Sequence, residues 1–243
     1  MLKTLRAALI TAPLIAIATA VMGSLNLLVA LWDDKGDAQL GVARAWGRML
    51  LSIAGVRARV EGLEKIDPHR SYVVVANHVS YMDTPLILTH LPVNFRFMAK
   101  KELFQIPFIG SHLGKAGHIA VPRDDPRAAV KVMSSAGRMM KERGISVLVF
   151  PEGGRSATGE LQTFKDGAAY LAVKGGVPVL PVAHQGMHAI LPMHSWLVRP
   201  GDVVVRIGDV IEVESGKIDR AALTEQLRST IAELQRSEPV YTA

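Results

Sequence analysis

Residues 7–32 contain no charged side chain, and this segment constrains the fold of the chain more than any other feature. Lys3 and Arg6 precede it, and Asp33 and Asp34 follow it. As a helix it would extend roughly 39 Å, against about 30 Å for the hydrocarbon core of a bilayer. We therefore expect an N-terminal hydrophobic helical membrane anchor, and the basic residues ahead of it predict a cytoplasmic N-terminus.

A cleaved secretory signal is the alternative interpretation of this segment. The Ala-Thr-Ala sequence at residues 18–20 resembles a small-residue cleavage site. Apolar residues continue past this point to Leu31, however, and the chain has no cysteine of the kind that cross-links exported proteins. Both observations favour the anchor. Pro13 is expected to end or bend the first turns of the helix.

Residues 37–54 predict a second, amphipathic helix, because Leu40, Trp46 and Leu50 recur at helical spacing while two arginines share another face. Such a helix either lies in the membrane interface against the anchor or packs onto a globular core. We assign residues 1–55 to an N-terminal, membrane-associated helical part.

From residue 56 onward, short β-branched runs alternate with helical segments. We expect strands at 56–60, 72–76, 95–99, 119–122, 146–150, 177–182 and 203–207, and helices at 84–90, 126–143, 168–174 and 219–236. The alternation predicts an α/β domain over residues 56–243, with a mixed, largely parallel central sheet flanked by helices.

Composition excludes several classes of chemistry. Because the chain has no cysteine, disulfide frameworks, thiolate metal sites and a cysteine nucleophile are excluded. The formal net charge of +6 is concentrated in residues 94–144, a stretch suited to phosphate ligands, anionic lipid or nucleic acid, or to a simple solvated face. Since this stretch has few stacking aromatics, we expect no nucleic-acid partner.

Polar residues follow the apolar strand at 72–76 directly. His78 and Asp83 meet only if the segment between them turns, and Asn77 and Ser80 are turn-forming residues. A neutral imidazole is a competent proton acceptor, and a carboxylate on its far nitrogen fixes the tautomer. The pattern predicts a catalytic dyad; the alternative is a surface histidine followed by a helix-capping aspartate.

A second polar loop follows the apolar strand at 146–150. Glu152, Gly153 and Arg155 lie in it, and Arg155 offers a planar fork that suits phosphate. Ligands in open α/β sheets bind at the carboxyl ends of strands, so two polar turns at that edge point to one site. Taken alone, this loop is also compatible with an ordinary tight turn.

Two further stretches complete the pattern. Residues 100–123 combine basic ends, which include Lys100 and Arg123, with an apolar middle, so that the cations suit a phosphate while the apolar residues border an apolar surface. The same stretch is compatible with a loop and short helix packed on the sheet. Residues 176–182 form a proline-marked apolar strand, which is uninformative by itself.

In this order, the four elements resemble the glycerolipid acyltransferase family, most closely its bacterial 1-acylglycerol-3-phosphate acyltransferases. The resemblance runs from about residue 59 to 211, and His78 with Asp83 matches the family's histidine, four residues, aspartate motif without a gap. The stretches 100–123, 150–156 and 177–181 match the other three blocks. Gly154 departs from the family, which usually has threonine there.

The resemblance implies a function for each matched residue. It implies acyl transfer from an acyl-CoA or acyl carrier protein thioester to the 2-hydroxyl of a 1-acylglycerol 3-phosphate. His78 and Asp83 would be catalytic, Glu152 and Gly153 would help place the acceptor, and the substrate's phosphate would be bound by Lys100, Arg123 and Arg155. It further implies a bacterial inner-membrane protein whose catalytic domain faces the cytoplasm, with lysophospholipid, acyl donor and membrane lipid as partners and no cofactor.

Three alternatives stay open at this stage. In the first, the acyl acceptor is a lyso-ornithine lipid or glycerol 3-phosphate. In the second, the chain is a non-catalytic, membrane-tethered lipid-binding protein. His184, His188 and His194 raise the question of a metal site. Because Gly186 and Pro192 favour a loop there and no carboxylate lies nearby, we expect no metal.

Overall fold

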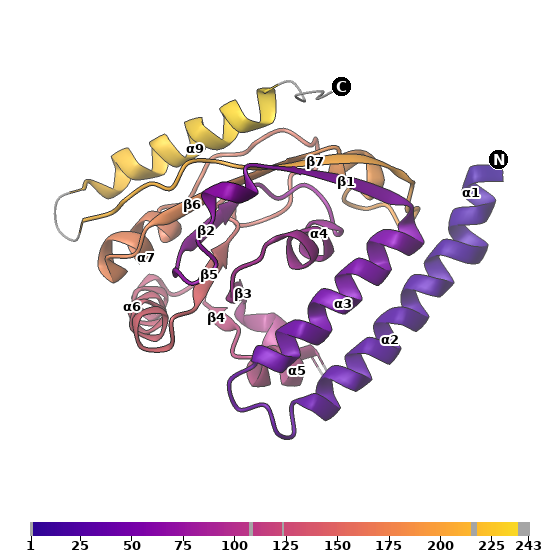
Figure 1. Cartoon of the computed structure of the whole chain (residues 1–243), viewed down its shortest axis with the longest axis horizontal. Coiled ribbons are helices and arrows are strands. Elements are labelled where there is room, and N and C mark those ends of the chain that lie inside the picture. The colour runs from indigo at the N-terminus through magenta and orange to yellow at the C-terminus, as the bar shows by residue number, and fades with distance from the viewer. Residues whose placement is uncertain (1, 107–108, 123, 215–217, 238–243) are drawn as a thin grey trace.

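A seven-stranded sheet forms the centre of the fold (Figure 1). The computed structural model describes residues 2–106, 109–122, 124–214 and 218–237. The strands are β1 (Val56–Glu61), β2 (Val73–Ala76), β3 (Phe95–Lys100), β4 (Ile119–Val121), β5 (Ser146–Val149), β6 (Val179–Gln185) and β7 (Gly201–Ile207). Their order across the sheet is β1-β7-β6-β2-β5-β3-β4.

The sheet is mixed and largely parallel, as predicted. Every neighbouring pair of strands is parallel except β6 and β7, which are antiparallel. Strands β7 and β1 therefore run opposite to the other five. Since β2, β5 and β6 are parallel neighbours, the loops that follow β2 and β5 leave the sheet at the same edge.

Helices cover both faces of the sheet (Figure 1). One face carries α3 (Asp37–Ala54) and α4 (Asp83–His90), and the other carries α6 (Pro126–Arg143), α7 (Gly167–Gly175) and α9 (Arg220–Arg236). Three short helices are η3 (Lys101–Gln105), α5 (Ile109–Lys115) and α8 (Met187–Ile190). We predicted a loop around residue 186, and this prediction is wrong for Met187–Ile190, which form the single helical turn α8.

The N-terminal segment is helical throughout its described length. It consists of α1 (Leu2–Arg6), a π-helical turn (Ala7–Thr11) and α2 (Ala12–Val29). Pro13 lies in the first turn of α2. Since proline has no N–H and crowds the preceding turn, the wider π-helical turn accommodates it, and the helix continues.

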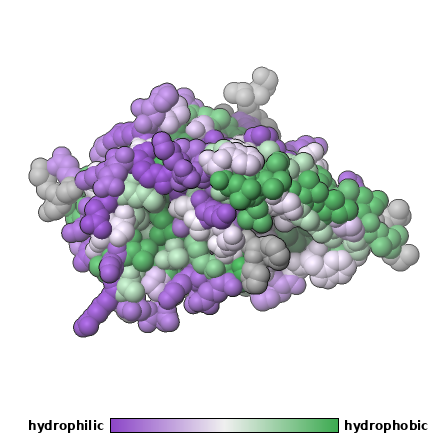
Figure 2. Space-filling model, turned by 90° about the horizontal axis from the view of Figure 1, so that it is seen from below, coloured by the Kyte–Doolittle hydropathy of each residue, from purple (hydrophilic) through white to green (hydrophobic). Residues whose placement is uncertain are grey.

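Helix α2 packs along α3 and exposes its other side. Trp46 of α3 is partly buried against the core and donates a hydrogen bond through Nε1 to Thr19 Oγ1 at 3.1 Å. Helix α3 packs onto the core and also lies against α2, and its place in a membrane interface stays a prediction. The exposed side of α1 and α2 is apolar, as the green surface in Figure 2 shows, and includes Leu9, Leu14, Ile17, Val21, Leu25 and Leu28.

Residues Thr4–Val29 form a helix that is long and apolar enough to cross a membrane, judged by length and composition. The division of the chain into residues 1–55 and 56–243 stays a prediction. Its boundary falls at Gly55, where α3 ends in a left-handed conformation with φ of 71° before β1 starts.

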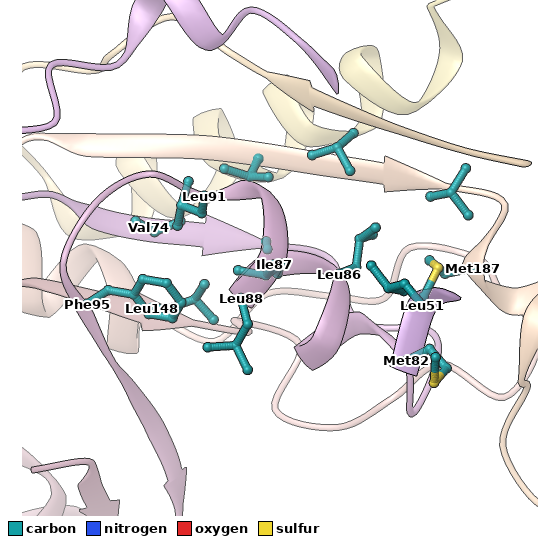
Figure 3. Close-up of a cluster of buried hydrophobic side chains, with 14 of the residues drawn as sticks. Leu51, Val74, Met82, Leu86, Ile87, Leu88, Leu91, Phe95, Leu148 and Met187 are labelled. Atoms are coloured by element: carbon teal, nitrogen blue, oxygen red, sulfur yellow. The ribbon is translucent and has the colours of Figure 1, made fainter. Parts of the chain in front are cut away.

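Two apolar clusters lie on opposite faces of the sheet. Val74 points into the cluster beneath α4, with Leu86 and Leu148 (Figure 3), while Val73 and Val75 point into the cluster beneath α6, α7 and α9. This alternation follows from the two-residue period of a strand. All four residues of β2 are fully buried, so the loop that follows β2 starts from a rigid position.

Candidate active site

His78 and Asp83 meet in the turn between β2 and α4. His78 Nδ1 lies 2.7 Å from Asp83 Oδ2, which also accepts hydrogen bonds from the backbone N–H groups of Val79 at 2.7 Å and Ser80 at 2.9 Å. Asp83 is the first residue of α4, and its carboxylate faces back into the turn. The structure thus unites the two residues predicted as a dyad, and the helix-capping alternative does not describe the contact.

The environment of His78 favours a neutral imidazole. Its ring stacks on Phe150, with centroids 3.9 Å apart and planes at 12°. Burial lowers the pKa of His78, Asp83 raises it, and the charge of Arg155 lowers it, with a net shift below the usual value. Because the carboxylate of Asp83 accepts the Nδ1–H, Nε2 carries the lone pair that accepts a proton.

Glu152 joins the two polar loops. Its Oε1 accepts a hydrogen bond from the backbone N–H of His78 at 2.6 Å, and its Oε2 accepts one from that of Gln162 at 3.0 Å. Burial raises the pKa of Glu152, while these hydrogen bonds lower it. Gly153 next to it has a φ of 75°, and a side chain there would press on Lys165. Both residues hold the loop beside His78.

Arg155 lies against the same turn. Its Nε donates a hydrogen bond to the carbonyl oxygen of Ser80 at 3.0 Å, and its guanidinium lies 4.4 Å from the centre of the Tyr81 ring. Within the described residues, neither terminal guanidinium nitrogen has a hydrogen-bond partner. Partial burial lowers the pKa of Arg155. The structure therefore brings a cation beside the base, with two N–H-bearing groups available to an anion.

The two other predicted phosphate ligands are less defined. Lys100 ends β3, is half-exposed, and its Nζ lies 3.6 Å from Glu102 Oε2. No contact among the described residues joins Lys100 to His78 or Arg155. Arg123 lies outside the described residues.

His184 is a residue whose place the sequence did not reveal. It lies on β6, is buried, and its Nε2 is 2.9 Å from the carbonyl oxygen of Asn77, whereas the ring of His188 bonds to Ala157 at 3.1 Å. In the described part of the chain, no group of three His, Cys, Asp or Glu side chains is arranged to hold a metal ion. The parallel pairing of β2 with β6 places His184 next to the site.

An apolar cavity of about 570 Å³ lies between helices α2, α3 and α5 and strand β3. Thr84, the residue after Asp83, belongs to its lining, whereas His78, Asp83 and Arg155 do not. Leu27, Leu40, Trp46, Phe97 and Leu113 are among the other lining residues. The cavity suits a long apolar group.

Comparisons with known proteins identify the family of the chain. Residues 57–185 match the family described as "Acyltransferase". A 1-acyl-sn-glycerol-3-phosphate acyltransferase of Pseudomonas aeruginosa is 31% identical over 225 residues, covering 90% of this chain and 86% of the relative. Relatives with the same description from Limnanthes douglasii and Cocos nucifera are 30% and 32% identical over 72% and 82% of this chain, but the chain spans only 61% and 64% of their length.

A solved structure also matches almost the whole chain. It is the crystal structure of the 1-acyl-sn-glycerophosphate acyltransferase PlsC from Thermotoga maritima, with a TM-score of 0.77 and 29% identity, covering 97% of this chain and 99% of that one. The family match, the Pseudomonas relative and this structure agree on the family, while the roles of His78, Asp83 and Arg155 stay predictions. The chain belongs to the acyltransferase family.

Proposed function

We propose that the protein transfers a fatty acyl group from an acyl-CoA or acyl carrier protein thioester to the 2-hydroxyl of 1-acylglycerol 3-phosphate, giving phosphatidic acid for phospholipid biosynthesis. One observation carries this proposal: Arg155, the candidate phosphate-binding cation, contacts the turn that carries the candidate base His78. Arg155 bonds to Ser80, which also donates its backbone N–H to Asp83, the partner of His78. A hydroxyl and a phosphate on one small molecule fit these two groups together.

The reaction uses His78 as a general base. Nε2 takes the proton of the acceptor hydroxyl, and the oxygen attacks the thioester carbonyl carbon. The tetrahedral intermediate collapses with cleavage of the carbon–sulfur bond, and the imidazolium returns its proton to the leaving thiolate. Asp83 stabilises the imidazolium through Nδ1 at 2.7 Å. No cofactor takes part in these steps.

Binding of the acceptor is assigned to the residues around the turn. We assign the phosphate to Arg155, and we keep Lys100 and Arg123 as further phosphate ligands on the ground of the family resemblance alone. Glu152 and Gly153 support acceptor binding by holding the loop that carries Arg155 next to His78. The apolar cavity whose lining includes Thr84 receives an acyl chain.

The apolar N-terminal helices support association with a membrane. Their exposed leucines and isoleucines form an apolar surface whose exposure to water is unfavourable. The lysophospholipid substrates reside in the bilayer. Lys3 and Arg6 ahead of the helix favour a cytoplasmic N-terminus. A catalytic domain on the cytoplasmic side of the bacterial inner membrane then requires that the helix lies within one leaflet instead of crossing the bilayer.

A thiol-release assay tests this function. Acyl-CoA and acyl carrier protein donors are combined with 1-acylglycerol 3-phosphate, lyso-ornithine lipid and glycerol 3-phosphate. The absence of cysteine means that the protein adds no thiol background. We expect release with 1-acylglycerol 3-phosphate and a loss of about 10²- to 10⁴-fold in His78→Ala, the range typical of a general base.

Other outcomes of this assay contradict the proposal in distinct ways. Binding of anionic lipid without thiol release from any donor would identify a lipid-binding protein. Preference for a phosphate-free acceptor would refute the role given to Arg155, and equal activity in a folded His78→Ala variant would remove the proposed base.

A further inference from the structure

Asn77 and His184 clamp two neighbouring strands beside the catalytic turn. The regular pairing of β2 with β6 ends at Ala76 and Val182. Beyond it, the side-chain amide of Asn77 makes the hydrogen bonds that the backbone of a strand would make. Its Nδ2 donates to the His184 carbonyl oxygen at 3.1 Å, and its Oδ1 accepts from the His184 N–H at 2.9 Å. The His184 ring bonds back to the Asn77 carbonyl oxygen at 2.9 Å. These contacts fix the ring in both position and orientation.

The same ring faces the second oxygen of Asp83. Oδ2 accepts the three hydrogen bonds described above, whereas Oδ1 is buried without a hydrogen-bond partner among the described residues. His184 Nε2 lies 3.6 Å from Oδ1, and both side chains are fully buried. A buried carboxylate oxygen without a donor is costly, so the dipole of a nearby N–H stabilises it.

The other nitrogen of the His184 ring identifies its tautomer. Nδ1 is buried and has no partner within the described part of the chain. A proton on Nδ1 would leave a buried N–H without an acceptor. The tautomer with its proton on Nε2 fits the site, because that proton faces both Asn77 and Asp83.

We propose that His184 is a positioning residue for acyl transfer: its Nε2–H donates to the Asn77 carbonyl oxygen and, 3.6 Å from Asp83 Oδ1, stabilises that oxygen through its dipole, which keeps Oδ2 directed at His78. This inference rests on the function proposed above and adds a third member to the dyad. His184 touches neither substrate nor the reacting atoms, and it acts through Asp83.

The proposal predicts a change in pH dependence as well as in rate. The titratable and charged groups around His78 are Asp83 of α4, Glu152 and Arg155 of the loop after β5, and His184 of β6, with Tyr81 contacting Arg155. Burial is the main cause of the lowered pKa of His78, and Asp83 raises that pKa. The Nε2–H dipole of His184 offsets part of the negative charge of Asp83, so removing the imidazole of His184 raises the pKa of His78 and moves the acidic limb of kcat/KM to higher pH.

The first test is kinetic. His184→Phe keeps a ring and removes the N–H, and we expect kcat to fall by about tenfold, the low end for a lost hydrogen bond to a charged group, with acceptor KM within twofold. His184→Gln retains an N–H on a side chain of similar reach, and we expect it to restore most of kcat. His188→Phe is the matched control, because the ring of His188 bonds to Ala157 away from Asp83.

Two kinetic results would overturn the proposal. One is an unmoved acidic limb in His184→Phe despite a lower kcat, which is what a role in packing alone produces. The other is an equal loss of kcat in His184→Phe and His184→Gln when the two variants have the same thermal stability.

The second test needs no variant that must fold. In the wild-type protein labelled with ¹⁵N-histidine in detergent micelles at pH 8, we expect the His184 resonances to show the tautomer with its proton on Nε2. A proton on Nδ1 would refute the contact. If the wild-type protein released no thiol, the proposed function would fail, and this measurement would still decide whether His184 faces Asp83 as inferred.

Discussion

Replacing Asp83 with asparagine removes one charge from the fully buried carboxylate of the site and preserves its size. Asp83 Oδ2 accepts hydrogen bonds of 2.7, 2.7 and 2.9 Å from His78, Val79 and Ser80. The carbonyl oxygen of asparagine can accept from the same three donors, so the turn keeps its hydrogen bonds. What disappears is the ion pair that forms when His78 takes a proton.

The loss follows from the geometry of that pair. With charge centres about 4 Å apart and an effective dielectric constant near 20, the attraction is about 4 kcal/mol. Removing it from the transition state lowers kcat by roughly 10³-fold, at about 1.4 kcal/mol for each factor of ten. The acceptor KM stays within a few-fold, because Asp83 contacts protein groups and not substrate.

The pH profile of the variant has a defined direction. Burial lowers the pKa of His78, and the hydrogen bond and charge of Asp83 raise it. Without that charge the pKa of His78 falls further, so the acidic limb of kcat/KM moves to lower pH. This shift is opposite in sign to the one expected for His184→Phe.

Thiol release by purified enzyme in detergent micelles measures both quantities. Asp219→Asn is the matched control, because Asp219 caps α9 by accepting from the Ala222 N–H and lies outside the site. A folded Asp83→Asn variant with kcat within threefold of wild type, or with its acidic limb at higher pH, would refute the reasoning.

Further predictions concern binding and stability. Arg155→Ala is expected to raise KM for 1-acylglycerol 3-phosphate at least tenfold and to affect phosphate-free acceptors little; equal effects on both would indicate a structural role. Burial lowers the pKa of His118 to about 3, so protons bind the unfolded chain more readily and stability falls as pH drops from about 6.5 toward 3. Urea denaturation should show a shallower fall in His118→Gln, and an unchanged slope would contradict this. Gly36→Ala is expected to lower Tm by several degrees, since φ is +77° and a Cβ would collide with the Ala116 carbonyl oxygen, whereas Gly114→Ala, with open space around it, serves as the control.

The fold class was predictable because strands and helices carry different hydrophobic periods. The strand expected at 146–150 is observed as Ser146–Val149, and the helix expected at 126–143 is observed at those bounds. The strand expected at 177–182 is observed as Val179–Gln185. Its extension depends on antiparallel pairing with β7, a contact between residues far apart in the chain, such as His184 with Val205.

The short helices were harder to predict. Helix α8 is one turn that follows Gly186, and α5 contains two glycines. Neither has the length or the apolar repeat on which a sequence-based assignment depends, and tertiary packing stabilises both.

Local contacts of the candidate site were predictable from the sequence, and distant ones were not. His78 and Asp83 are five residues apart in one turn-forming stretch, so their contact is local and could be predicted. The hydrogen bond by which Glu152 joins two loops could not be predicted, because its partner His78 is 74 residues away. His184 was considered only as a metal ligand, since a loop was expected near it.

By itself, the sequence determined the apolar N-terminal helix, the α/β alternation, the absence of thiol chemistry and the pairing of His78 with Asp83, because each depends on residues close together in the chain. Only the tertiary structure decided that Arg155 contacts Ser80, 75 residues away, and that His184 contacts Asn77, 107 residues away. Strand order makes these contacts, and it results from burying the whole sheet between two layers of helices, which no local pattern of residues specifies.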